Sequence, residues 1–189
     1  MSRKKIVAVS TAFVMTIMSG CGTETKKGTP LAHHVKDSGE HNVNTASLDW
    51  EVDNGEGLRI HTDVENIYMQ FDHSAAGQGI KNIQFIIDID NNSSTGNAEE
   101  KGADFIVENG YLYASQKRDL WDWKEIGKVK SSVEDLTDTI EIPKSLLHYS
   151  HGPFGVLAEA LDDKWQPVLY SPSSVDENKV HTKTVYIPR

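Results

Sequence analysis

The residues with the clearest chemical meaning lie in one short acidic segment near the middle of the chain. Asp88, Asp90, Asn92 and Ser94 occupy every second position there, and Asp104 follows further along. All five carry side-chain oxygens, the ligands that Ca²⁺ prefers, and alternate spacing lets a curling backbone aim successive side chains at one ion. The pattern predicts a structural Ca²⁺ site made by the first four residues, with Asp104 closing it from the next strand.

Two other interpretations of the acidic segment remain open. An EF-hand loop needs glycine at its sixth position, where Ser93 stands here, and flanking helices, which are not expected; only Glu99, at the twelfth position, fits. An Asx-rich turn is the stronger alternative, because Asp and Asn side chains accept hydrogen bonds from nearby backbone amides and Gly96 supplies a positive φ. Repulsion among three neighbouring carboxylates without a cation favours the metal site.

Aromatic residues are the candidates for ligand contact. Trp121 and Trp123 stand two positions apart, as do Tyr111 and Tyr113. On a strand, residues two apart share a face, so each pair would form a platform on which a sugar ring stacks. The alternative is packing in or beside the core, which is the commoner role of aromatic side chains. The pattern predicts a carbohydrate-binding surface at these four residues and leaves the packing role open.

The sequence lacks the motifs that would support catalysis. It holds no Gly-x-Ser-x-Gly motif of a serine hydrolase and no glycine-rich phosphate loop. A glycosidase needs two carboxylates around one bond, but 28 acidic residues make such pairs uninformative. Glu159 lies in an apolar run and is expected to point outward from a strand. We predict that the protein is not an enzyme, and a hydrolase using buried carboxylates such as Glu159 is the least favoured alternative.

Short strands are the elements that must position these residues. From residue 47 onward apolar and polar residues mostly alternate with a period of two, and turn residues separate the runs. Asn109 and Gly110 lie between two such runs and predict a type I′ β-hairpin. The stretch 154–161 is compatible with a strand or a helix. About nine or ten short strands predict an all-β fold, a jelly-roll-like β-sandwich over residues 47–189.

A family resemblance covers this predicted domain. Residues 85–96 read FIIDIDNNSSTG, residues 102–113 read GADFIVENGYLY, and residues 140–147 read IEIPKSLL. Together they resemble carbohydrate-binding-module family nine and the DOMON-like group of exported bacterial β-sandwiches. The resemblance implies a β-sandwich and a structural Ca²⁺ site at Asp88, Asp90, Asn92 and Asp104. It implies no particular ligand, because such sandwiches bind sugars, haem or nothing known.

The N-terminus predicts an exported lipoprotein. Basic residues precede an apolar stretch, Ile6 to Met18, that is shorter than the roughly 20 residues of a membrane-spanning helix. Ser19 and Gly20 then precede Cys21, the single cysteine. This resembles the bacterial lipoprotein signal, which implies cleavage of residues 1–20 and acylation of Cys21. Gly22, by the same resemblance, favours the outer membrane if the host is Gram-negative. Residues 21–46 are polar and predict a flexible linker.

Composition and charge limit the classes of binding partner. The chain has 189 residues, of which 38% are hydrophobic, and a formal net charge of −9. That is the composition of one globular domain, and the negative charge makes nucleic acid an unfavourable partner. The membrane is reached through the lipid anchor. The predicted function is a lipid-anchored extracytoplasmic binding module, with a glycan as its ligand. The alternative is an accessory or structural lipoprotein that binds another protein of the cell envelope.

Overall fold

The computed structural model describes Leu31, residues 43–173 and residues 183–188. The predicted signal peptide, residues 1–20, and the predicted lipidation site Cys21 lie outside the described residues, as does most of the predicted linker, 21–46. The regular elements of the described part are all β-strands except one short 3-10 helix, η1 (Ser74–Ala76).

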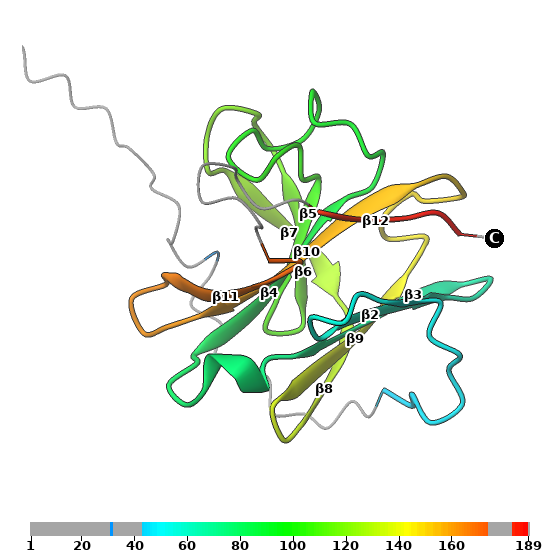
Figure 1. The fold of residues 1–189 in the computed structure, drawn as a ribbon. Coiled ribbons are helices and arrows are strands. Elements are labelled where there is room, and N and C mark those ends of the chain that lie inside the picture. Colours follow the sequence, from blue (N-terminus) through cyan, green and yellow to red (C-terminus); the bar gives the residue numbers. More distant parts are fainter. Residues whose placement is uncertain (1–30, 32–42, 174–182, 189) are drawn as a thin grey trace, which may run out of the picture.

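Two antiparallel sheets form a β-sandwich (Figure 1). The five-stranded sheet has the order β1-β2-β3-β9-β8, and the seven-stranded sheet has the order β11-β10-β4-β5-β6-β7, with β12 also paired to β10. The predicted all-β sandwich is confirmed, and the described residues form twelve strands against the nine or ten expected. These strands are β1 (Val52–Asp53), β2 (Leu58–Thr62), β3 (Asn66–Asp72), β4 (Asn82–Asp88), β5 (Phe105–Glu108), β6 (Tyr111–Ser115), β7 (Trp123–Lys128), β8 (Lys130–Glu134), β9 (Thr137–Pro143), β10 (Phe154–Leu161), β11 (Pro167–Ser171) and β12 (Thr184–Tyr186).

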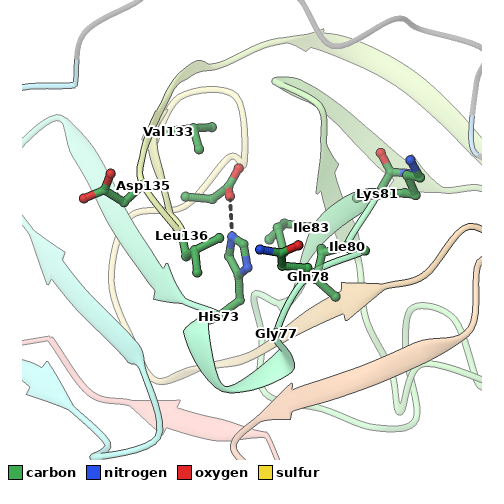
Figure 2. A pocket seen from close by; sticks show the side chains of 12 residues that line it. His73, Gly77, Gln78, Ile80, Lys81, Ile83, Val133, Asp135 and Leu136 are labelled. Atoms are coloured by element: carbon green, nitrogen blue, oxygen red, sulfur yellow. Dashed lines mark hydrogen bonds and ion pairs between the residues drawn. The ribbon is translucent and has the colours of Figure 1, made fainter.

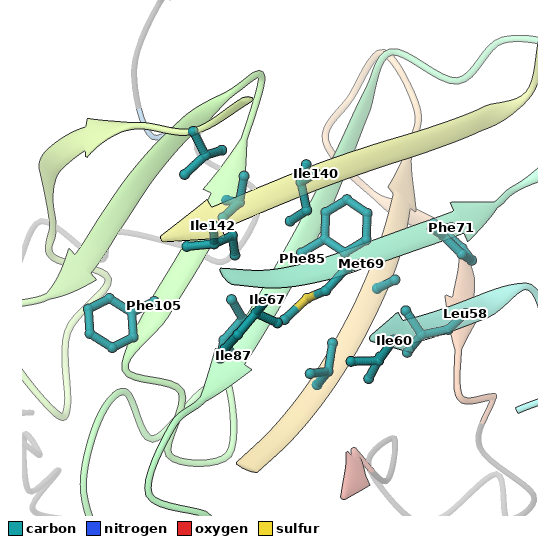
Figure 3. Packing of buried hydrophobic residues seen from close by; sticks show 14 of the residues in the cluster. Leu58, Ile60, Ile67, Met69, Phe71, Phe85, Ile87, Phe105, Ile140 and Ile142 are labelled. Carbon is teal, nitrogen blue, oxygen red and sulfur yellow. The ribbon is translucent and has the colours of Figure 1, made fainter. Parts of the chain in front are cut away.

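The main core fills the space between the two sheets. Alternate residues of β3 and β9 meet alternate residues of β4 and β10, as the period of two requires. Met69, Phe85 and Ile142 are among the side chains that interlock there, each at most 2% exposed (Figure 3). Because consecutive residues point to opposite faces, the other half of β4, β5 and β10 points to the outer face of the seven-stranded sheet.

Strand β10 resolves the ambiguity between strand and helix in the stretch 154–161. It lies between β4 on one side and β11 and β12 on the other, and every one of its residues is buried. Ala158 and Ala160 face the core, where small side chains let the opposite sheet approach. Tertiary packing therefore overrides the helical propensity of these alanines.

The hairpin between β5 and β6 forms as its sequence predicts. Glu108 pairs directly with Tyr111, so Asn109 and Gly110 make up a two-residue turn. Both turn residues have positive φ, at 53° and 79°. That is the requirement of a type I′ turn, and it fixes the register of β6 against β5.

Candidate functional site

Three of the predicted metal ligands meet at one end of the seven-stranded sheet. Asp88 ends β4, Asp90 follows it, and Asp104 immediately precedes β5. One carboxylate oxygen from each lies within 4.8 Å of the others, so this group could hold a metal ion. Asp88 is only 2% exposed, while Asp90 is exposed and Asp104 is half-buried. The cluster therefore opens to solvent on the side of Asp90.

Asn92 and Ser94 take part in the turn that carries these carboxylates. The Asn92 amide donates to Asp88 Oδ1 at 3.1 Å and to Asp90 Oδ1 at 2.9 Å, and the Ser94 amide donates to Asn92 Oδ1 at 3.1 Å. These are the backbone contacts of an Asx-rich turn, the alternative to the metal site. The turn is therefore present, and it gathers the carboxylates into a group that could hold a metal ion.

Glycine lets this loop close tightly. Gly96 has a φ of +55°, and Gly102 has a φ of +87°. A Cβ on Gly102 would lie 2.5 Å from the Ser93 Cα, a distance that side chains do not tolerate. The loop folds back on itself through a bridge between Asn97 and Ala103, and this return brings Asp104 beside Asp88.

A lysine far along the chain supplies positive charge to the cluster. Lys183 Nζ lies 2.9 Å from Asp88 Oδ2 and also donates to the carbonyl of Lys101. Burial, together with the neighbouring charges of Asp90 and Asp88, raises the pKa of Asp104 to about 6, although a hydrogen bond from the Ile89 amide and the charge of Lys183 act in the opposite direction. The carboxylates thus share one ammonium and carry excess negative charge.

The four predicted aromatic ligand residues share the outer face of the seven-stranded sheet. Tyr111 and Tyr113 lie on β6, and Trp123 begins β7 beside Ser115. Trp121 precedes β7, and its ring meets Trp123 edge-to-face at 5.6 Å between centroids. Lys128 Nζ lies 4.9 Å from the centre of the Tyr111 ring. The spacing of two on β6 places Tyr111 and Tyr113 on one side of the sheet, whereas Trp121 reaches that side from the segment before β7.

Burial distinguishes the members of this aromatic group. Tyr113 is 2% exposed and Trp121 is 8% exposed, and Trp121 packs with Ile86, Ile106 and Leu157 in a second apolar cluster. Tyr111 and Trp123 are only half-buried. The packing role that the sequence left open therefore describes Tyr113 and Trp121. Leu31, the one described residue of the first 42, also packs against this cluster.

A row of polar side chains crosses the same face and was missed as a group by sequence reasoning. The strand register aligns Glu159 of β10 with Gln84 of β4, and Gln84 with Glu108 of β5. Gln84 Nε2 donates a hydrogen bond to Glu108 Oε2. The expectation that Glu159 points away from the core holds, but its side chain is 1% exposed rather than solvated. The residues lie 24 and 75 positions from Gln84, so no local spacing could align them.

Comparison with protein-family models, with curated proteins and with solved structures finds no match to this chain. The resemblance to carbohydrate-binding-module family nine and the DOMON-like group therefore stays a prediction. Within the described residues, no helix has the length and apolarity needed to cross a membrane.

Proposed function

We propose that the protein is a lipid-anchored, extracytoplasmic binding module whose ligand is a carbohydrate. The observation that carries this proposal is the pair of half-buried rings, Tyr111 and Trp123, on a sheet face where the buried Tyr113 and Trp121 pack beside them. Sugars offer apolar ring faces that pack on aromatic rings, and hydroxyls that accept hydrogen bonds from groups such as an indole N–H. The anchor is Cys21, on the sequence evidence of the signal.

Trp123 is the strongest single candidate for ligand contact. Its ring is half-buried, and its indole Nε1 is a buried donor with no hydrogen-bond partner among the described atoms. A buried indole N–H normally finds an acceptor, and leaving one unpaired costs about 1–3 kcal/mol. A sugar hydroxyl beside the ring supplies that acceptor.

The test of this function is a glycan array followed by calorimetry on the glycans that bind. We expect Trp123→Ala and Tyr111→Ala each to weaken binding about tenfold, which corresponds to about 1.4 kcal/mol. Trp165→Ala is the matched control, because Trp165 is a half-buried tryptophan in the turn between β10 and β11. Absence of binding to every glycan, or equal losses in all three variants, would contradict the proposal.

We propose further that the cation held by Asp88, Asp90 and Asp104 is Ca²⁺ and that its role is structural. Three carboxylates are hard oxygen ligands, and Ca²⁺ accepts irregular coordination with waters completing its shell. The ion would take over from the Lys183 ammonium as the counter-charge of Asp88. It would supply the positive charge that the cluster lacks and tie the end of β4 to the start of β5.

The second candidate function, binding of another envelope protein, has its own supporting observation. Among the described strands, β11 and β12 pair only with β10, so their other edges face no described strand. Val168, Val185 and Ile187 are exposed there, at 49%, 48% and 71%. An apolar edge of this kind suits addition of a strand from a partner.

Crosslinking on cells followed by co-purification tests the second function. Val168→Lys and Val185→Lys place charges on the edge, and we expect them to remove a partner captured by the wild type. Val64→Lys is the control, because Val64 is 93% exposed and precedes β3 on the other sheet. Capture that all three variants retain would contradict binding through this edge.

A further inference from the structure

A hollow of about 320 Å³ opens at one end of the sandwich, away from the acidic cluster and the aromatic face. One wall is the segment 77–82 that leads into β4 (Figure 2). The other is formed by Val133 near the end of β8 and by Asp135 and Leu136 in the turn between β8 and β9. His73 and Asp138 lie at its base. The volume falls at the small end of the range for ligand pockets, about 300–1,000 Å³.

The base of the hollow breaks the pattern of the core. On β3 and beyond it, the inward positions are occupied by Met69, Phe71 and then His73; on β9, Asp138 pairs with Phe71 and precedes the inward Ile140. Two polar residues thus continue two apolar rows. Burying polar groups at these two positions costs free energy, and apolar residues there would avoid that cost.

Asp138 provides a partner for only one of the two ring nitrogens of His73. His73 Nε2 lies 3.1 Å from Asp138 Oδ2, with the side chains 7% and 15% exposed. His73 Nδ1 is also buried and has no hydrogen-bond partner among the described atoms. Buried polar atoms in folded proteins nearly always have a partner, and a missing one marks a place for an ordered water or a ligand group.

The walls of the hollow indicate the chemistry of that ligand. Val133 and Leu136 are 45% and 41% exposed and give an apolar surface, while Lys81, Asn82 and Asp135 offer donors and acceptors of hydrogen bonds. An anion would be repelled by the carboxylates of Asp135 and Asp138, and an apolar ligand would leave the polar groups unpaired. A neutral sugar ring with many hydroxyls can pack against the apolar side chains and form hydrogen bonds with the polar ones.

A second hollow, of about 410 Å³, lies next to the first and shares Val133 and Asp135 with it. Its lining is rich in hydroxyl and amide groups, namely Thr45, Gln70, Ser132, Thr137 and Thr139. A chain of sugars could pass from one hollow to the other over the turn between β8 and β9. The first hollow, with His73 and Asp138 at its base, then receives the end of that chain.

We propose that the hollow above His73 and Asp138 binds the terminal ring of a neutral glycan, at a site separate from the aromatic face. This inference rests on the proposed carbohydrate ligand but not on the aromatic residues. Asp138 accepts hydrogen bonds from ring hydroxyls, Asn82 and Lys81 donate to them, and Val133 with Leu136 packs against the apolar side of the ring.

The experiment is saturation-transfer NMR and calorimetry on the full chain, with glucose, galactose, mannose, xylose, cellobiose and maltose as probes. We expect at least one of these sugars to bind and to shift the His73 ring resonances. Asp138→Asn removes an acceptor at constant shape, and Val133→Trp fills the hollow from an exposed position. We expect each to weaken binding at least tenfold. Val64→Trp is the control, because Val64 is an exposed valine before β3 that lines neither hollow.

The outcomes separate this inference from the proposed function. Loss of binding in Asp138→Asn and Val133→Trp, with Trp123→Ala unchanged, supports the hollow as the site. Loss in Trp123→Ala alone leaves the aromatic face as the site and overturns this inference. If none of the six sugars binds, the hollow does not take a neutral sugar, while the glycan array still decides the function of the aromatic face.

Discussion

Lys183 Nζ and Asp88 Oδ2 form a buried ion pair at 2.9 Å, between side chains that are 9% and 3% exposed. The two residues lie 95 positions apart, and the pair ties the segment before β12 to the end of β4. Coulombic attraction at this distance is strong only because water is largely excluded. The ammonium is therefore the nearest counter-charge of Asp88 in the described structure.

Removing the Lys183 ammonium should therefore test whether the cluster binds a cation. In EDTA, Lys183→Met leaves Asp88 buried without its counter-charge, and we expect a loss of about 3 kcal/mol in the free energy of unfolding. Added Ca²⁺ should restore most of that loss, because a ligand at 100 times its Kd stabilises the folded state by about 2.7 kcal/mol. Urea titrations in EDTA and in CaCl₂ measure both effects.

Lys117→Met is the control for that experiment. Lys117 pairs with Asp122 at 2.9 Å, but the two side chains are 60% and 41% exposed, so we expect a change of at most about 1 kcal/mol. The change in the free energy of unfolding caused by Lys117→Met should also be the same in EDTA and in CaCl₂. A Lys183→Met variant that stays equally unstable in EDTA and in CaCl₂ would rule out a cation site at Asp88.

The stability of the cation-free protein should depend on the protonation of Asp104. Its pKa is 3.8 in the unfolded chain and about 6 in the fold, so folding favours the protonated form. This contribution is complete below pH 3.8 and is lost as the pH rises through 6. Asp104→Asn mimics the protonated form, and we expect it to exceed the wild type by about 1 kcal/mol at pH 7.5 in EDTA, a figure reduced for the partial exposure of Asp104.

Urea denaturation from pH 3.5 to 7.5 in EDTA measures that difference. The two free-energy curves should diverge between about pH 4 and pH 6, with the wild type falling below the variant. Asp163→Asn, an exposed residue in the turn after β10, is the control and should parallel the wild type. Parallel curves for Asp104→Asn would show that Asp104 titrates normally.

Gly102 should be required in the acidic loop because a side chain has no room there, and not only because its φ is positive. Gly102→Ala adds a Cβ 2.5 Å from the Ser93 Cα, and Gly79→Ala adds one with no atom within 4 Å, although both glycines have positive φ. We expect about 1 kcal/mol of destabilisation from Gly79→Ala and about 2–4 kcal/mol from Gly102→Ala. Thermal melts measure the difference, and equal losses would mean that the loop adapts without strain.

Cys21 is expected to hold the protein at the membrane. Cys21→Ser removes the acylated thiol, and without acyl chains we expect the protein to move from the detergent phase to the aqueous phase in a Triton X-114 partition. Labelling of cells with radioactive palmitate should mark the wild type and leave the variant unmarked. A variant that still partitions into detergent would point to another means of membrane attachment.

The local features of this fold could be predicted from the sequence. The period of two sorts β3, β4 and β9 into inward and outward residues, and Asn109-Gly110 fixes the hairpin of β5 and β6. Both patterns involve residues that are close in the chain, where covalent geometry allows few backbone conformations. The stretch 154–161 could not be assigned in this way, because Ala158 and Ala160 suit a helix as well as a buried strand.

The candidate sites also combine features that are local in the sequence with contacts between residues far apart in the chain. The alternate spacing of Asp88 and Asp90 marks the acidic loop in the sequence itself, because both residues lie in one turn. The contact of Lys183 with Asp88 and that of His73 with Asp138 join residues 95 and 65 positions apart. Only the pairing and packing of distant strands decides such contacts, because alternation tells which side of a strand a residue occupies but not which residue of another strand it will face.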